Sequence, residues 1–148
     1  MNLQIIKAKR SDGSLLLDMM IQFNREEAIE IPIEVMKKTL ELSFSNPNHV
    51  QTFLALDGER VIGYMHVCFS FSFEYQGMEA SIDEIYILNE NRRLGLAKAV
   101  IHEVESVIRS MGVVIFRADV SDDKPWLNDF YNKIGFQQAS YRPYYKRL

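Results

Sequence analysis

The feature of the sequence that most constrains the fold is a helical segment between two strand-like runs. From Leu96 to Met111, apolar residues recur at helical spacing and most of the charged residues lie off that face. The preceding run, Ala80 to Leu88, is strand-like, and the following run, Val113 to Val120, is nearly continuously apolar and predicts a buried strand. The order strand, helix, strand predicts a parallel crossover, with Gly112 capping the helix.

Antiparallel strands are predicted before this crossover. Val50 to Leu56 and Val61 to Phe73 are β-rich runs separated by Asp57-Gly58-Glu59-Arg60, which is a hairpin signal. With Ala80 to Leu88 as the next strand, they predict a meander. A first strand is expected over Leu3 to Lys9.

Helical spacing predicts further helices over Leu15 to Phe23 and Pro32 to Phe44. A short helix is expected over Trp126 to Ile134, because proline precedes it and Gly135 follows it. The Tyr-rich tail, Ser140 to Leu148, contains Pro143 and predicts a final edge strand. Together these elements indicate an α/β (α+β) fold, with a mixed, largely antiparallel twisted sheet flanked by about four helices.

Composition narrows the class of protein. A chain of 148 residues fits one domain, 1–148, and a net charge of −3 argues against a nucleic-acid partner. The apolar runs are too short to cross a membrane and the first residues lack the pattern of a signal peptide, so we expect no membrane partner and a cytoplasmic protein. Cys68 is the only cysteine, and no Cys/His spacing predicts a metal site.

The chain between the predicted strand and helix has the properties of an anion site. A helix that opens at Gly95 leaves several backbone N–H groups without intrahelical partners, and the positive end of its dipole favours phosphate. Arg92 and Arg93 add positive charge, and Gly95 and Ala97 keep the turn slim. The spacing matches neither the dinucleotide nor the P-loop fingerprint, which argues against a dinucleotide or ATP site.

These residues resemble the cofactor signature of the GNAT superfamily of N-acetyltransferases, Gln/Arg-x-x-Gly-x-Gly/Ala, which is met here by Arg92, Gly95 and Ala97. A second segment, Phe130 to Phe136, is similar to the family's Tyr-x-x-x-Gly-Phe segment. The resemblance covers Ala80 to Phe136 well, the central hairpin loosely and the first fifty residues only in layout. It implies a GNAT-like fold with the crossover at the CoA site and acetyl-CoA as co-substrate.

The resemblance also implies which residues contact the cofactor. The pyrophosphate is expected on the segment Arg92, Arg93, Leu94, Gly95, Leu96, Ala97 and Lys98, chiefly through its amides. Pantetheine and the thioester are expected to contact the main chain of Ile85, Tyr86 and Ile87. Lys124 occupies a position where the family often carries asparagine, and Lys124 and Asn128 are further candidate contacts.

For catalysis, the resemblance assigns Tyr131 as the general acid near the CoA sulfur, with a core tyrosine as the alternative. Asp83 and Glu84 are the candidate bases. Because neighbouring strand residues face opposite sides, we expect only one of them to face the cleft. Asp83 shares parity with Ser81, Ile85 and Ile87 and is preferred as the base over Glu84 and over a water relay. Electrostatic recognition of a cationic substrate is the alternative role for both acids.

The sequence therefore predicts an acetyl-CoA-dependent N-acetyltransferase that acts on a primary amine, in a small molecule or peptide, by direct attack in a ternary complex. An acidic segment has two possible roles: it attracts a cationic acceptor, or it is only a solvated face of the protein. The segment comprises Glu26, Glu27, Glu30 and Glu34. A non-catalytic acyl-CoA sensor or interaction domain is the alternative function. The edge offered by the Tyr-rich tail is compatible with a homodimer.

Overall fold

The computed structural model describes residues 2–148. They form two compact units, one extending to Ala118 and the other spanning Asp119–Leu148. The first unit contains the sheet and three of the α-helices, and the second contains a short helix and the tail. Each unit is described by itself.

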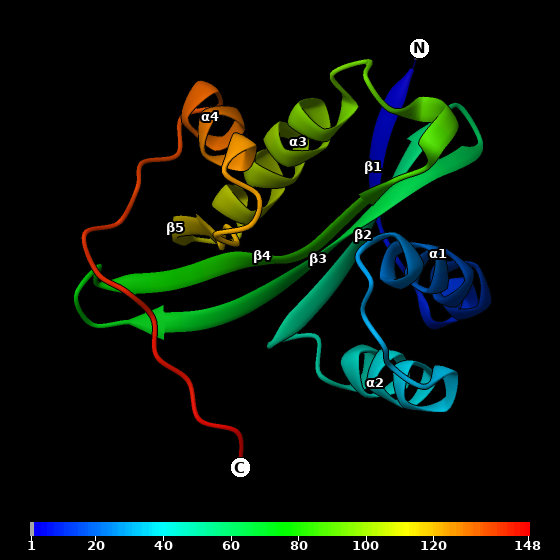
Figure 1. Ribbon diagram of the computed structural model, residues 1–148, viewed down its shortest axis with the longest axis horizontal. Coiled ribbons are helices and arrows are strands. Elements are labelled where there is room, and N and C mark those ends of the chain that lie inside the picture. Colours follow the sequence, from blue (N-terminus) through cyan, green and yellow to red (C-terminus); the bar gives the residue numbers. More distant parts are fainter. Residues whose placement is uncertain (1) are drawn as a thin grey trace. The chain divides into compact units, whose positions relative to one another are not determined.

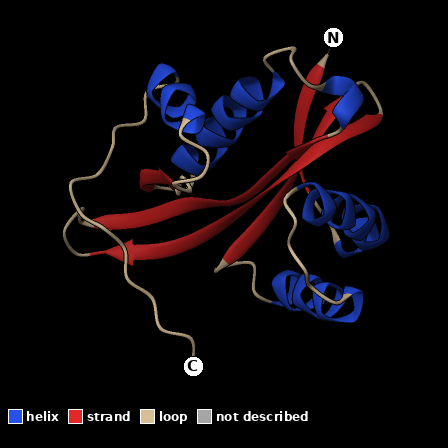
Figure 2. Ribbon diagram, in the orientation of Figure 1, coloured by secondary structure: helices blue, strands red, loops and turns tan. Residues whose placement is uncertain are grey.

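The first unit is built on a five-stranded sheet in the order β1-β2-β3-β4-β5 (Figures 1 and 2). Strands β1 to β4 are antiparallel to their neighbours, and β5 runs parallel to β4, so the predicted meander and parallel crossover are confirmed. The strands are β1 (Leu3–Lys7), β2 (Val50–Asp57), β3 (Arg60–Ser72), β4 (Gly77–Ile87) and β5 (Val113–Ala118). Gly58 adopts a φ of 62° in the tight turn between β2 and β3, which a glycine allows without strain.

Helices cover both faces of this sheet. Helices α1 (Gly13–Glu26) and α2 (Ile33–Ser45) lie on one face, and α3 (Leu96–Ser110) lies on the other (Figure 1). Short 3₁₀ turns, η1 (Arg10–Asp12) and η2 (Asn89–Asn91), precede α1 and the loop that leads to α3. The two faces therefore have separate cores.

The core beneath α1 and α2 joins helix and strand side chains. Its buried members are Ala8, Leu16, Met19, Leu40, Leu54, Tyr64 and Tyr86. On α3, the buried residues are Leu96, Val100, Ile101, Val104 and Ile108, which follow the helical spacing seen in the sequence. Burial of these stripes against the sheet is the main force that holds the helices in place.

Strands β3 and β4 approach each other very closely at one point. A Cβ built on Gly63 would lie 2.3 Å from the carbonyl oxygen of Tyr86, so only glycine fits there. The start of the loop after β4 is fixed to β3 as well, because the Leu88 amide donates to the Ile62 carbonyl at 2.9 Å. This end of β4 is therefore held firmly from one side.

Two strand predictions were wrong. β5 ends at Ala118 rather than Val120 and is not fully buried; Val114 is 55% exposed, because β5 is the last strand of the described sheet and pairs only with β4. In the second unit, α4 (Trp126–Lys133) forms as expected, but no residue of 137–148 lies in a strand. Tyrosine favours extended backbone, but a strand forms only when it pairs with a neighbouring strand. Pro143 also lacks the N–H that such pairing uses.

None of the helices described in residues 2–148 is long and apolar enough to span a membrane.

Candidate active site

Only part of the β4 edge that faces β5 is paired with that strand. β5 pairs with Met78 to Ile82, whereas β4 continues to Ile87, so among the described residues positions 83 to 87 have no neighbouring strand on that side. The bond from Leu88 to Ile62 fixes the alternation of backbone groups: those of Tyr86 turn towards β3, and those of Ile85 and Ile87 turn to the open side. The backbone groups of Ile85 and Ile87 therefore turn to the open side and those of Tyr86 turn to β3, while the predicted cofactor contacts of all three stay predictions.

The loop that follows this open edge prepares the N-terminus of α3. Arg93 and Gly95 both have positive φ, 63° and 74°, which turns the chain sharply before the helix. The Ala99 amide donates to the Gly95 carbonyl at 3.2 Å, so the amides of residues 96 to 98 precede the first helical bond. The N-cap residue of α3 is Gly95, so no side chain at that position caps the helix by a hydrogen bond. The loop thus presents backbone donors at the positive end of a helix dipole, as an anion site requires.

Glycine is favoured at position 95 for a reason that differs partly from the one expected. A Cβ built there meets no atom within 4 Å, so the space beside it is open to a ligand. The restriction comes from the left-handed φ, which side chains rarely adopt.

The side chain of Arg92 is already bound within the protein. Its Nε donates to the Ile87 carbonyl at 2.7 Å, its Nη2 lies 2.7 Å from Glu26 Oε2, and its guanidinium lies 5.0 Å from the centre of the Tyr86 ring. Burial raises the pKa of the Glu26 carboxyl, but bonds from Arg92, Tyr86 and Asn89 outweigh this and leave the pKa below its ordinary value. Arg92 therefore anchors the loop to the end of α1, and the exposed Arg93 and Lys98 are the cations directed to solvent.

The register of β4 contains an irregularity at Asp83. Ile82 pairs with Val67 and Glu84 pairs with His66, so Asp83 is an extra residue in the ladder, a β-bulge. The bulge reverses the alternation, so the prediction that Ser81 and Asp83 share one face with Ile85 and Ile87 was wrong: Ser81 faces the opposite side from Ile85 and Ile87. Ser81, Glu84 and Tyr86 share one face, while Ile82, Ile85 and Ile87 share the other.

Glu84 lies in a largely enclosed polar group. Tyr64 donates its hydroxyl hydrogen to Glu84 Oε1, and the Glu84 side chain is 19% exposed. Burial raises the pKa of Glu84; the bond from Tyr64 opposes this rise and the charge of Asp83 adds to it. Burial also raises the pKa of the Tyr64 hydroxyl, as does the charge of Glu84. A carboxylate with raised proton affinity is suited to accept a proton near neutral pH.

A histidine joins Glu84 to the next strand. His66 Nε2 lies 3.9 Å from Glu84 Oε1, and His66 Nδ1 lies 2.7 Å from Thr52 Oγ1. Burial lowers the pKa of His66 to about 4, so the ring is neutral near pH 7. Neither Thr52 nor Tyr64 has a predicted role, because each has the properties of an ordinary strand residue in the sequence.

In the second unit, the Gly-Phe segment forms the cap of α4. Gly135 has a φ of 98°, its amide donates to Asn132, and the Phe136 amide donates to Tyr131 at 3.0 Å, which together make a Schellman motif. The rings of Tyr131 and Phe136 pack 5.2 Å apart. Burial, and then the charge of Asp119, raise the pKa of Tyr131, so its hydroxyl keeps its proton. The motif therefore fixes the end of the helix that carries Tyr131, and burial together with Asp119 keeps the Tyr131 hydroxyl protonated.

Comparison with known proteins identifies the family. The profile described as "Acetyltransferase (GNAT) family" matches residues 15–136. The chain belongs to the GNAT acetyltransferase family. A comparison with curated proteins found no significant match.

Solved GNAT-like structures share the whole fold at low identity. A possible acetyltransferase from Clostridium difficile 630 has a TM-score of 0.90 at 16% identity, covering 99% of this chain and 97% of that one. AAC(6')-Iy in complex with the bisubstrate analog CoA-S-monomethyl-acetylneamine has a TM-score of 0.81 at 15% identity, covering 100% and 99%. The aminoglycoside acetyltransferase meta-AAC0020 from an uncultured soil metagenomic sample, in complex with sisomicin, has a TM-score of 0.77 at 17% identity, covering 99% and 96%.

The predicted site residues divide between the two units. The first unit brings together the open edge of β4, the loop before α3 and the group of Tyr64, His66 and Glu84. The second contains Tyr131 and Asn128 on α4 and Lys124 just before it, where the Lys124 amide donates to the Ser121 carbonyl at 2.9 Å.

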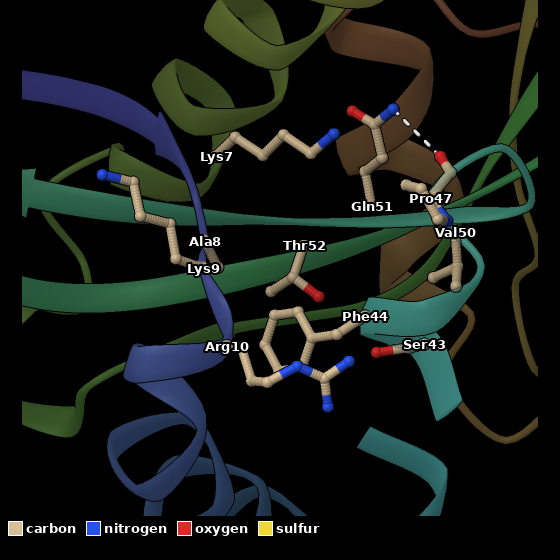
Figure 3. A pocket seen from close by; sticks show the side chains of 10 residues that line it. All are labelled: Lys7, Ala8, Lys9, Arg10, Ser43, Phe44, Pro47, Val50, Gln51 and Thr52. Carbon is tan, nitrogen blue, oxygen red and sulfur yellow. Dashed lines mark hydrogen bonds between the residues drawn. The ribbon is translucent and has the colours of Figure 1, made fainter. Parts of the chain in front are cut away.

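A hollow of about 200 Å³ lies elsewhere in the first unit, at the β1 edge of the sheet (Figure 3). It is lined by Lys7, Ala8, Lys9, Arg10, Ser43, Phe44, Pro47, Val50, Gln51 and Thr52. None of these is a predicted site residue, and β1 and β4 are separated by two strands in the sheet. The hollow therefore lies apart from the predicted site residues, although one of its lining residues, Thr52, also contacts His66.

Proposed function

We propose that the chain is an acetyl-CoA-dependent N-acetyltransferase that acetylates a primary amine by direct attack within a ternary complex. The observation that carries the proposal is the open edge of β4 next to the uncapped N-terminus of α3. Backbone groups of Ile85 and the amide of Ile87 suit the amide-bearing pantetheine arm, and the amides of residues 95 to 98 suit the pyrophosphate. The CoA analog bound by a GNAT relative supports this assignment.

Several properties of the loop before α3 suit acetyl-CoA. Donors lie on the backbone, the space beside Gly95 is open, and Arg93 and Lys98 add exposed positive charge. Leu94, Leu96 and Ala97 contribute backbone amides to the same turn, and Ala97 also has a small side chain. Acetyl-CoA supplies the activated acetyl group as a thioester.

We assign the general base to Glu84 in preference to Asp83. Glu84 is held by Tyr64 and enclosed, and its pKa is raised, whereas Asp83 is exposed on the bulge. Glu84 takes a proton from the acceptor nitrogen so that a neutral amine attacks. Asp83 contributes negative charge that attracts a cationic acceptor.

We assign the general acid to Tyr131, whose hydroxyl donates its proton to the departing sulfur. Burial and Asp119 keep that hydroxyl protonated, and the Schellman cap fixes the end of the helix that carries it. Lys124 and Asn128 are assigned to cofactor contact.

The acceptor class is a small cationic amine. Glu30 and Glu34 are exposed, as the sequence pattern suggested, but Glu26 is engaged by Arg92 and contributes structure instead. The relative solved with sisomicin supports aminoglycosides as candidates, together with polyamines.

The test is an acceptor screen with acetyl-CoA, read by thiol release and confirmed by product mass. Polyamines, aminoglycosides and peptide N-termini form the panel. We expect turnover with at least one cationic small amine. Acetyl-CoA binding without any turnover would favour the acyl-CoA sensor, and no binding would contradict both.

A tyrosine variant tests the acid. Tyr131→Phe is expected to lower kcat by about 10²-fold or more while leaving acetyl-CoA affinity unchanged, because it removes only the hydroxyl. Tyr144→Phe is the matched control, since Tyr144 is 95% exposed. Equal turnover of the two variants would remove Tyr131 from the mechanism.

A further inference from the structure

His66 forms the middle of a row of polar side chains across three strands. Thr52 on β2 is its Cα partner on one side, and Glu84 on β4 is its partner on the other. Directly paired residues project to the same face of a sheet, so the three side chains line up. His66 is only 7% exposed and Thr52 only 5%, which leaves both groups little access to water.

The ring of His66 is neutral, so one nitrogen carries hydrogen and the other is bare. Thr52 lies 2.7 Å from Nδ1, and its hydroxyl can either donate or accept, so this contact alone does not decide which nitrogen carries the hydrogen. The contact to Glu84 is more informative. An Nε2–H opposite a buried carboxylate would form a short charge-assisted bond, whereas the observed distance from Nε2 to Oε1 is 3.9 Å.

We propose that His66 is a positioning residue for Glu84: Thr52 accepts the Nδ1 hydrogen, and the bare Nε2 of His66 accepts a hydrogen bond from the Glu84 carboxyl after it has been protonated. The inference rests on the proposed role of Glu84 as base. The proton moves from the acceptor nitrogen to a Glu84 oxygen and stays on that oxygen, while His66 remains neutral. The 3.9 Å separation is then the resting arrangement of two acceptors, and it closes when Glu84 gains its hydrogen.

This arrangement increases the proton affinity of Glu84, because a bare nitrogen stabilises the acid form and not the carboxylate. Two other titratable groups act on Glu84, namely Tyr64 on β3 and Asp83 on the neighbouring position of β4. Cys68 on β3 faces the charge of Asp83, and Tyr86 on β4 is bonded to Glu26 of α1 and lies under Arg92. Tyr64 donates to Glu84 and therefore works in the opposite direction to His66.

The tautomer is measured directly by ¹⁵N NMR of the imidazole nitrogens in the full chain, with the His66 signals assigned by their loss in His66→Gln. We expect a protonated Nδ1 and a bare Nε2 between pH 6 and 8, about the neutral range. A protonated Nε2 would overturn the proposal. The measurement needs neither acceptor nor turnover.

The catalytic consequence is tested with Thr52→Val, which removes the acceptor of the Nδ1 hydrogen without a large change in shape. His66 should then shift to the Nε2–H tautomer, donate to the Glu84 carboxylate and lower the proton affinity of Glu84. The acidic limb of kcat/KM against pH should move down by about one pH unit, and Thr52→Ser should restore it. An unmoved limb in a folded Thr52→Val protein would contradict the proposal.

A separate variant distinguishes the two levels of inference. If Glu84→Gln leaves the acidic limb in place, the proposed base is wrong regardless of the tautomer. If Glu84→Gln abolishes the limb but His66 carries its hydrogen on Nε2, the base stands and only the positioning role is wrong.

Discussion

The loop before α3 and the polar row on β3 and β4 are built by different means. The loop offers backbone amides, with Arg93 and Gly95 at positive φ to shape it. The polar row depends on particular side chains, with Glu84 bonded by Tyr64 and flanked by His66. A backbone site tolerates many side chains, whereas a side-chain site fails when one of its members changes.

This difference predicts how each region responds to substitution. In the polar row, the proposed chemistry depends on single atoms, so loss of one group should be severe. Around the loop, effects should be smaller and should depend on backbone conformation.

The largest effect is expected for Glu84→Gln, which should lower kcat/KM by about 10²- to 10⁴-fold because the base is lost. Acetyl-CoA affinity, measured by calorimetry, should stay the same. Asp83→Asn is the matched control on the neighbouring residue and should cost less than about 10-fold, since it removes only a nearby charge. If Asp83→Asn lowered kcat/KM more than Glu84→Gln, then Asp83 and not Glu84 would be the base.

The second effect concerns the free energy of unfolding at acidic pH. The pKa of His66 falls from 6.5 to about 4 on folding, so the unfolded chain binds a proton more readily between these values. Stability should therefore decline as pH falls from about 6.5 to about 4, by about 3 kcal/mol from this group, and His66→Gln should lack that part of the decline. Denaturant unfolding at several pH values measures it, with the exposed His102→Gln as control. Identical pH dependence in the two variants would show that His66 is not buried as a neutral ring.

The third effect compares two glycines of the same helix. Gly95→Ala and Gly112→Ala both place a side chain at positive φ in open space, before and after α3, and each should cost about 1 kcal/mol of stability. Only Gly95→Ala should also weaken acetyl-CoA binding, by about 10-fold or about 1.4 kcal/mol. Equal affinities of the two variants for acetyl-CoA would argue against a phosphate site at this turn.

The smallest effect is expected for the side-chain anchor of the loop. Glu26→Gln removes the charge opposite Arg92 in a partly exposed pair and should change stability by less than about 1 kcal/mol. Acetyl-CoA affinity should fall only about 2- to 3-fold, because the donors are backbone amides. Glu90→Gln, which breaks the Arg60–Glu90 pair, is the control at the same loop. A loss above 10-fold in Glu26→Gln alone would mean that side chains, and not the backbone, hold the site in shape.

The sequence by itself determined the crossover and the turn at the start of α3. Helical spacing from Leu96, the strands on either side and Gly95 are local properties, and each constrains the backbone through a few neighbouring residues. The same holds for the cap of α4, where Gly135 and Phe136 fix the helix end that carries Tyr131.

Only the tertiary structure decided which acid belongs to the polar row and which arginine faces solvent. The bulge at Asp83 arises from pairing with β3, so no rule of alternation within β4 could locate it. The bonds from Tyr64 to Glu84, from Glu26 to Arg92 and between Thr52 and His66 likewise join residues from different strands or helices. Contacts of this kind depend on how distant segments pack, and packing is a property of the folded chain.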